Sequence, residues 1–112
     1  MSRTMILALA LFGLALPRLA AAQDAKLAQK GQQVFADQKC SMCHSVAGKG
    51  NVKGSLDSVG DKWKADEIRQ WIMTSKEMAA KHEATRKPPM KDFSGLPKGD
   101  VDALVAYLQT LK

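Results

Sequence analysis

The sequence has few aromatic residues, few cysteines and no block of like charge. Only 5% of its 112 residues are Phe, Trp or Tyr, and its two cysteines are Cys40 and Cys43. Nucleic-acid-binding domains combine clustered Lys and Arg with stacking aromatic rings, whereas the lysines here are scattered singly among acidic residues. We therefore exclude nucleic acid as a partner. Two cysteines so close together also exclude a small fold held by several disulfides.

The sequence also lacks an apolar run long enough to cross a membrane. The run Met5–Leu16 has 12 residues, against the ~20 of a spanning helix. It follows the basic Arg3 and precedes the small residues Ala20-Ala21-Ala22, which together have the form of an export signal. We expect residues 1–22 to be cleaved, leaving one periplasmic domain over residues 23–112. An uncleaved membrane anchor is the alternative.

Removal of this leader would leave a small and mildly basic chain. It would hold 15 Lys and Arg against 11 Asp and Glu, a net charge of +4. This charge favours docking to acidic protein faces, although an ordinary solvated surface would look the same. A chain of about 90 residues buries only about 60–65% of its unfolded surface, so it is marginally stable alone. A buried cofactor would supply the missing core.

The segment Cys40-Ser41-Met42-Cys43-His44 has the most specific chemistry. C-x-x-C-H is the attachment signature of a c-type haem: two thiols reach the vinyl groups on one porphyrin edge, and the histidine ligates the iron. The alternatives are a redox dithiol, a disulfide, or a zinc site completed by His82. The first lacks its usual βαβ pattern, the second leaves His44 unexplained, and zinc would need all four ligands. We predict one covalent haem, attached at Cys40 and Cys43, with His44 as the proximal ligand.

Apolar periodicity predicts three main helices. They cover Ala25–Gln38, Asp66–Lys81, and a last segment that begins near Pro97 or Lys98. The expected fold class is all-α, with loops that wrap one covalently attached haem. The residues expected to be buried on the helices are Leu27, Gly31, Val34, Phe35, Ile68, Trp71, Ile72, Met78, Val101, Leu104, Val105, Leu108 and Leu111.

Two segments between these helices are predicted to be non-helical. Ser45–Gly60 contains four glycines and scattered apolar residues, which is too irregular for a pair of strands, so we expect a loop. Arg86–Leu96 is expected to be extended, because Pro88 and Pro89 are incompatible with a helix interior.

A distal iron ligand is expected from Met90. Thioether sulfur suits a low-spin haem iron that transfers electrons. Met90 follows two prolines in a non-helical segment, whereas Met73 and Met78 fall at helical spacing and Met42 lies inside the attachment motif. His82 or an open sixth site are the alternatives.

Taken together, the motifs resemble the class I cytochromes c of the small bacterial, single-haem kind. The resemblance extends over about residues 31–111. The first helix has the family's glycine and aromatic residue (Gly31 and Phe35), and the attachment motif follows it (Cys40, Cys43 and His44). The next features are an L-x-x-V-G loop (Leu56, Val59 and Gly60) and an apolar second helix with tryptophan (Ile68, Trp71 and Ile72). A late methionine (Met90) and the last helix (residues 104–108) complete the set.

The resemblance implies that the first and last helices cross near a right angle, with Gly31 and Phe35 against Leu104 and Tyr107. It also implies a soluble, monomeric periplasmic electron carrier that is not an enzyme and that docks to redox proteins such as an oxidase, reductase or dehydrogenase. The alternatives are a dedicated cytochrome subunit of an exported oxidoreductase, and a haem enzyme or gas sensor with a labile sixth ligand.

Three positions depart from the family pattern. Gly54 stands where a proline often offers its carbonyl to the proximal imidazole, so we expect a looser loop there. Lys64 stands where the second helix often has a Ser or Thr cap, so the cap bond is missing or supplied by Asp66. No tyrosine directly precedes Met90 to donate a hydrogen bond to its sulfur.

Overall fold

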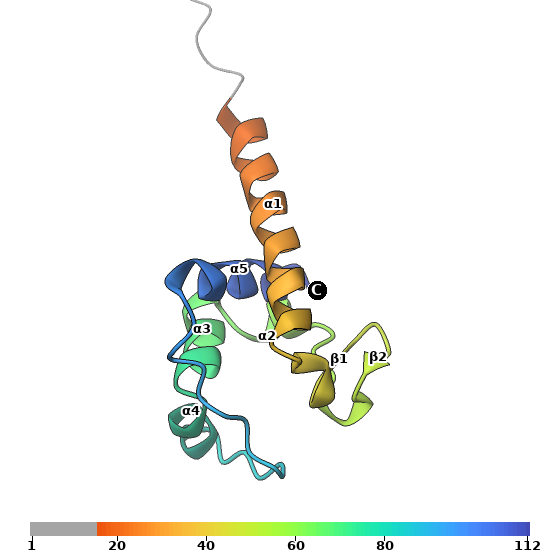
Figure 1. Ribbon diagram of the computed structural model, residues 1–112, viewed down its shortest axis with the longest axis vertical. Helices are drawn as coiled ribbons and strands as arrows, with labels where there is room; N and C mark the ends of the chain where they lie inside the picture. The colour runs from red at the N-terminus through yellow and green to blue at the C-terminus, as the bar shows by residue number, and fades with distance from the viewer. Residues whose placement is uncertain (1–15) are drawn as a thin grey trace, which may run out of the picture.

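The computed structural model describes residues 16–112, and this part of the chain is mainly helical, as predicted (Figure 1). The last helix is central, because it contacts the first helix and the two helices that lie between residues 59 and 73. In chain order the elements are α1 (Leu16–Asp37), η1 (Cys40–Met42), β1 (Ser45–Val46), β2 (Lys49–Gly50), η2 (Val52–Gly54), α2 (Val59–Lys62), α3 (Ala65–Met73), α4 (Ser75–Lys81) and α5 (Lys98–Gln109).

The first helix begins earlier than predicted, at Leu16 rather than Ala25. It therefore passes through the predicted cleavage site. The added segment Leu16–Asp24 contains three alanines and two leucines, which are good helix formers, but its side chains from Leu19 to Asp24 are all exposed. Periodicity detects a buried face, so it missed this part, which projects from the body in Figure 1. Arg3 and nearly all of the predicted apolar run lie outside the described residues.

The backbones of α1 and α5 approach each other as closely as Gly31 predicted. A Cβ on Gly31 would lie 2.5 Å from the carbonyl carbon of Ala103 and 2.7 Å from Cβ of Tyr107. One turn later, the rings of Phe35 and Tyr107 meet edge to face, with centroids 5.7 Å apart, a favourable geometry. The predicted contact is confirmed, except that the backbone of Ala103, rather than Leu104, faces Gly31.

The core forms where these two helices meet α3. Most of the predicted stripe is buried. Among the described residues, the buried apolar side chain that the pattern missed is that of Ala103, which is small and gives little apolar signal. The buried polar residues Ser45 and Ser75 were missed as well. The core cluster consists of Val34, Phe35, Ile68, Ile72, Val101, Leu104, Val105 and Leu108. Leu27, Trp71 and Leu111 are only half-buried.

The predicted second helix is wrong in one respect, because it is broken at Thr74. Thr74 has φ −132° and ψ 51°, outside the helical region, and this divides the segment into α3 and α4. At the start of α3, the Lys64 N–H donates to the Glu67 carboxylate at 3.1 Å. The Lys64 side chain makes no cap hydrogen bond, so the capping contact at this end is made by Glu67, not by Asp66.

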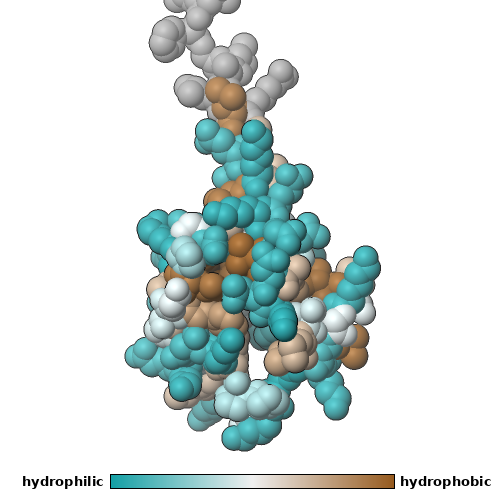
Figure 2. All heavy atoms as spheres, viewed as in Figure 1, coloured by the Kyte–Doolittle hydropathy of each residue, from teal (hydrophilic) through white to brown (hydrophobic). Residues whose placement is uncertain are grey.

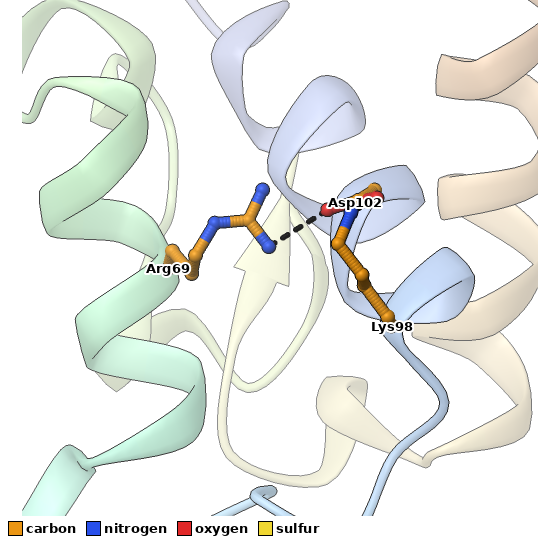
Figure 3. Close-up of polar contacts among 3 residues, drawn as sticks. All are labelled: Arg69, Lys98 and Asp102. Atoms are coloured by element: carbon orange, nitrogen blue, oxygen red, sulfur yellow. Dashed lines mark hydrogen bonds and ion pairs between the residues drawn. The ribbon is translucent and has the colours of Figure 1, made fainter.

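A charged contact holds α3 against α5 (Figure 3). Asp102 on α5 accepts from Arg69 of α3 at 2.8 Å and from Lys98 one turn earlier at 2.9 Å. Hydrogen bonds from Lys98 and Arg69 lower the pKa of Asp102.

The prediction of an irregular loop over Ser45–Gly60 is also wrong in part. β1 and β2 pair antiparallel, and the turn between them has φ 51° at Ala47 and φ 80° at Gly48. Two successive positive φ values match a two-residue hairpin turn. The short helix α2 also begins inside this segment. Between α4 and α5 the chain has no helix, as predicted for Arg86–Leu96.

Candidate cofactor-binding cavity

A hollow lies between the helical core and the segments that carry the predicted site residues. Its inner part, about 350 Å³, is mostly apolar, and its outer part is about 510 Å³. Figure 2 shows the lower half of the molecule hollowed between the α3–α4 side and the hairpin side. The two parts form one site, because they share five lining residues: Cys40, His44, Trp71, Met90 and Phe93.

The attachment motif forms a tight turn at the mouth of this hollow. The N–H groups of Cys43 and His44 both donate to the carbonyl of Cys40, at 3.2 and 2.9 Å, so the two cysteines and the histidine are held on one turn. Cys40 is half-buried and Cys43 exposed, and both thiols are free. Burial raises the pKa of the Cys40 thiol. The disulfide alternative is therefore not the arrangement that the structure shows.

The imidazole of His44 is oriented by one hydrogen bond. Its Nδ1 lies 2.9 Å from the carbonyl oxygen of Gly54, and since a carbonyl only accepts, Nδ1 carries the proton. Nε2 then keeps its lone pair for a metal. Burial lowers the pKa of His44, which favours the neutral, ligating form. Gly54 thus supplies the carbonyl that its departure from the family pattern had placed in doubt.

Gly54 also makes room for a charged side chain that the sequence reasoning missed. A Cβ at this position would collide with the Cys43 carbonyl oxygen and would lie 2.9 Å from Cζ of Arg86. The positive charge of Arg86 further lowers the pKa of His44. No local sequence pattern predicts the contact between Arg86 and Gly54, because Arg86 belongs to the distant segment that leads to Met90.

Met90 is the methionine best placed for a ligand role. It is half-buried and lines both parts of the hollow. Met42 lines only the outer part and is 71% exposed, within the attachment turn. Met78 is buried, and Met73 packs against the core cluster, but neither lines the hollow.

His82 occupies a different place from the one that the zinc alternative requires. Its ring packs against Trp63 and Trp71, with centroid distances of 4.8 and 5.8 Å. Over the chain from residue 16 on, no three His, Cys, Asp or Glu side chains are grouped so that they could hold a metal ion. The structure therefore does not bring His82 to the cysteine pair.

The lining fits a haem in its polarity as well as in its ligands. Among the described residues, Trp71 Nε1 is a buried donor that has no hydrogen-bond acceptor. Leaving such a donor unsatisfied costs about 1–3 kcal/mol, and Trp71 lines the hollow, where an acceptor on a bound group would satisfy it. A haem offers an apolar macrocycle to the apolar wall and carboxylates as acceptors.

Sequence reasoning missed two further aromatic residues of the site. Trp63 lines the inner part, and Phe93 lines both parts. The only available signal for Phe93 was an apolar residue three positions after Met90. Trp63 stands alone in a lysine-rich segment, outside any apolar stripe.

Comparison with known proteins places the chain in a family. A family model described as Cytochrome c matches residues 28–112, from the point where α1 begins to be buried to the end of the sequence. Comparisons with curated proteins and with solved structures gave no match. In the described part of the chain, no helix is both long and apolar enough to span a membrane. The family match covers well over half of the sequence, so this chain belongs to the cytochrome c family, has its all-α fold and is a haem-based electron carrier.

Proposed function

We propose that this protein is a soluble periplasmic carrier of single electrons, with one haem attached at Cys40 and Cys43 and ligated by His44 and Met90. The haem, when bound, supplies an iron that changes between the ferric and ferrous states. The observation that carries the proposal is that all four side chains, from two segments far apart in the sequence, line one hollow.

The surrounding residues favour electron transfer over catalysis. The Gly54 carbonyl fixes the imidazole of His44, and the Met90 thioether would serve as a second iron ligand and raise the potential. With His44 and Met90 both bound to the iron, no substrate would reach the metal. The apolar inner wall excludes water, while Cys43 and Met42 are exposed at the outer edge, where electrons would leave.

The charges around the outer part favour acidic redox partners. Lys39, Arg86 and Lys91 all line it, so its field attracts a partner with an acidic docking face. Electron-transfer encounters of this kind are small and short-lived. The protein would act as a monomer that meets an oxidase, reductase or dehydrogenase in turn.

The leader proposal is compatible with the packing of α1. Over residues 19–22, cleavage before Gln23 would remove only exposed side chains, and from residue 19 on the first side chain that is not exposed is Leu27. The domain would then comprise residues 23–112. Intact mass of the exported protein should equal this chain plus one haem, and a full-length membrane-bound product would contradict the proposal.

The ligand assignment is tested on haem-loaded protein exported with haem-attachment machinery. The oxidised wild type should show the far-red sulfur-to-iron charge-transfer band. Met90→Ala should abolish this band, lower the potential and open the iron to added ligands. Met78→Leu and His82→Ala should leave the spectrum unchanged. Rapid binding of carbon monoxide by the wild type at neutral pH would instead indicate a ligand-binding haem protein.

A further inference from the structure

The break between α3 and α4 is filled by the segment that follows Met90. In a continuous helix, the Lys76 N–H would donate to the Ile72 carbonyl four residues earlier. Here each group has a different partner: the Lys76 N–H donates to Asp92 Oδ1 at 3.0 Å, and the Ile72 carbonyl accepts from the Phe93 N–H at 2.9 Å. One helical hydrogen bond is thus replaced by two bonds to the Met90 segment.

Ser75 adds a third connection at the same place. Its side chain is fully buried, and its Oγ lies 2.7 Å from Asp92 Oδ1 and 2.9 Å from the carbonyl oxygen of Met90. The hydroxyl proton can serve either acceptor. A buried polar side chain is stable only when hydrogen-bonded, and both of its acceptors belong to the Met90 segment.

We propose that Asp92 and Ser75 are positioning residues that fasten the Met90 thioether to the distal side of the haem site. This proposal rests on Met90 as the distal ligand. The residues 82–97 around Met90 form no helix or strand, so no regular backbone ladder fixes them. The contacts at the α3–α4 break therefore hold the ligand where it is needed.

The proposal predicts a kinetic effect on ligand exchange. An added ligand can bind the iron only after Met90 has left it, and Met90 leaves more often when its segment is loosely held. Losing a hydrogen bond to a carboxylate should therefore speed the replacement of Met90 by imidazole, by roughly tenfold. The exchange is followed as the decay of the far-red band of the oxidised protein.

The test compares four variants in the haem-loaded protein. Asp92→Ala should show the full acceleration, and Ser75→Ala a smaller one, because Lys76 still holds Asp92. Asp92→Asn keeps an acceptor oxygen and should restore most of the wild-type rate. Glu67→Ala is the matched control: it also removes a carboxylate that caps a helix, but at the far end of α3. It should lower the denaturation midpoint and leave the exchange rate unchanged.

The outcomes separate this proposal from the proposed function. If the wild type shows no far-red band, the ligand assignment fails and the positioning role fails with it. If the band is present but Asp92→Ala exchanges at the wild-type rate, only the positioning role is overturned. Equal acceleration by Glu67→Ala would also overturn it, since the effect would then reflect general loss of stability. If Asp92→Ala does not fold, Ser75→Ala and Asp92→Asn decide the question.

Discussion

Gly31→Ala is a sharp test of the helix crossing, because its two expected effects have opposite signs. Alanine is favoured over glycine in a helix by up to about 1 kcal/mol. The added Cβ would, however, overlap the carbonyl of Ala103 and lie 2.7 Å from Tyr107 Cβ. Overpacking of this kind costs about 1–3 kcal/mol, and the upper half of this range applies since backbone cannot swing aside.

The net result should be a loss of about 1–2 kcal/mol in the free energy of unfolding. For a domain of this size, each 1 kcal/mol corresponds to about 4–8 °C in melting temperature. Gly31→Val places two methyl groups more than Gly31→Ala at the crossing and should lower the free energy of unfolding further. Thermal and denaturant unfolding of the haem-loaded protein, followed by circular dichroism, would measure both variants.

Gly99→Ala provides the control in the same pair of helices. Gly99 lies in α5, where a Cβ would meet only the flexible end of Lys30, at 3.3 Å. Helix propensity alone should then leave stability unchanged or raise it. If Gly31→Ala raised the melting temperature as much as Gly99→Ala does, the close approach of α1 and α5 would be refuted.

Two further predictions concern charge and cofactor attachment. Because the pKa of Asp102 is lowered in the folded protein, its contribution to stability is present above the unfolded pKa of about 3.9 and is lost as pH falls through the folded pKa. Asp102→Asn should therefore flatten the fall of the unfolding free energy below about pH 4. An unchanged slope would contradict the contacts of Asp102 with Lys98 and Arg69. Cys40→Ala should remove one thioether and Cys40→Ala with Cys43→Ala both, so that acid–solvent extraction strips the haem from the double variant. The double variant should also lose cooperative unfolding, and a well-folded haem-free protein would show that the cofactor contributes less than we expect.

Apolar periodicity was sufficient to predict the helices whose buried faces pack against each other. It gave the buried half of α1 and the start of α5, because in both helices one face repeats at helical spacing. It missed the exposed half of α1, which has propensity without a buried face. It also missed the break at Thr74, because the competing partners, Asp92 and Phe93, lie far along the chain.

The site could be predicted in its chemistry but not in its supports. Cys40, Cys43, His44 and Met90 came from motif and position, and the structure places them around one hollow; their role as haem ligands stays a prediction. The supporting contacts depend on tertiary structure. The family pattern marked the position of Gly54, but the sequence did not show that its carbonyl still holds His44. The unsatisfied indole of Trp71 has no signature in local sequence. The hairpin was missed because Ala47 adopts a positive φ that alanine rarely takes.

The interrupted helix at Thr74 also has a consequence for engineering this protein. Threonine is a poor helix former next to alanine, and a search for thermostable variants would favour replacing it so that α3 and α4 fuse. The fused helix would close the Lys76–Ile72 bond and withdraw both groups from Asp92 and Phe93. Selection for melting temperature alone would then favour a more rigid scaffold with a looser ligand segment, an instance of the stability–activity trade-off.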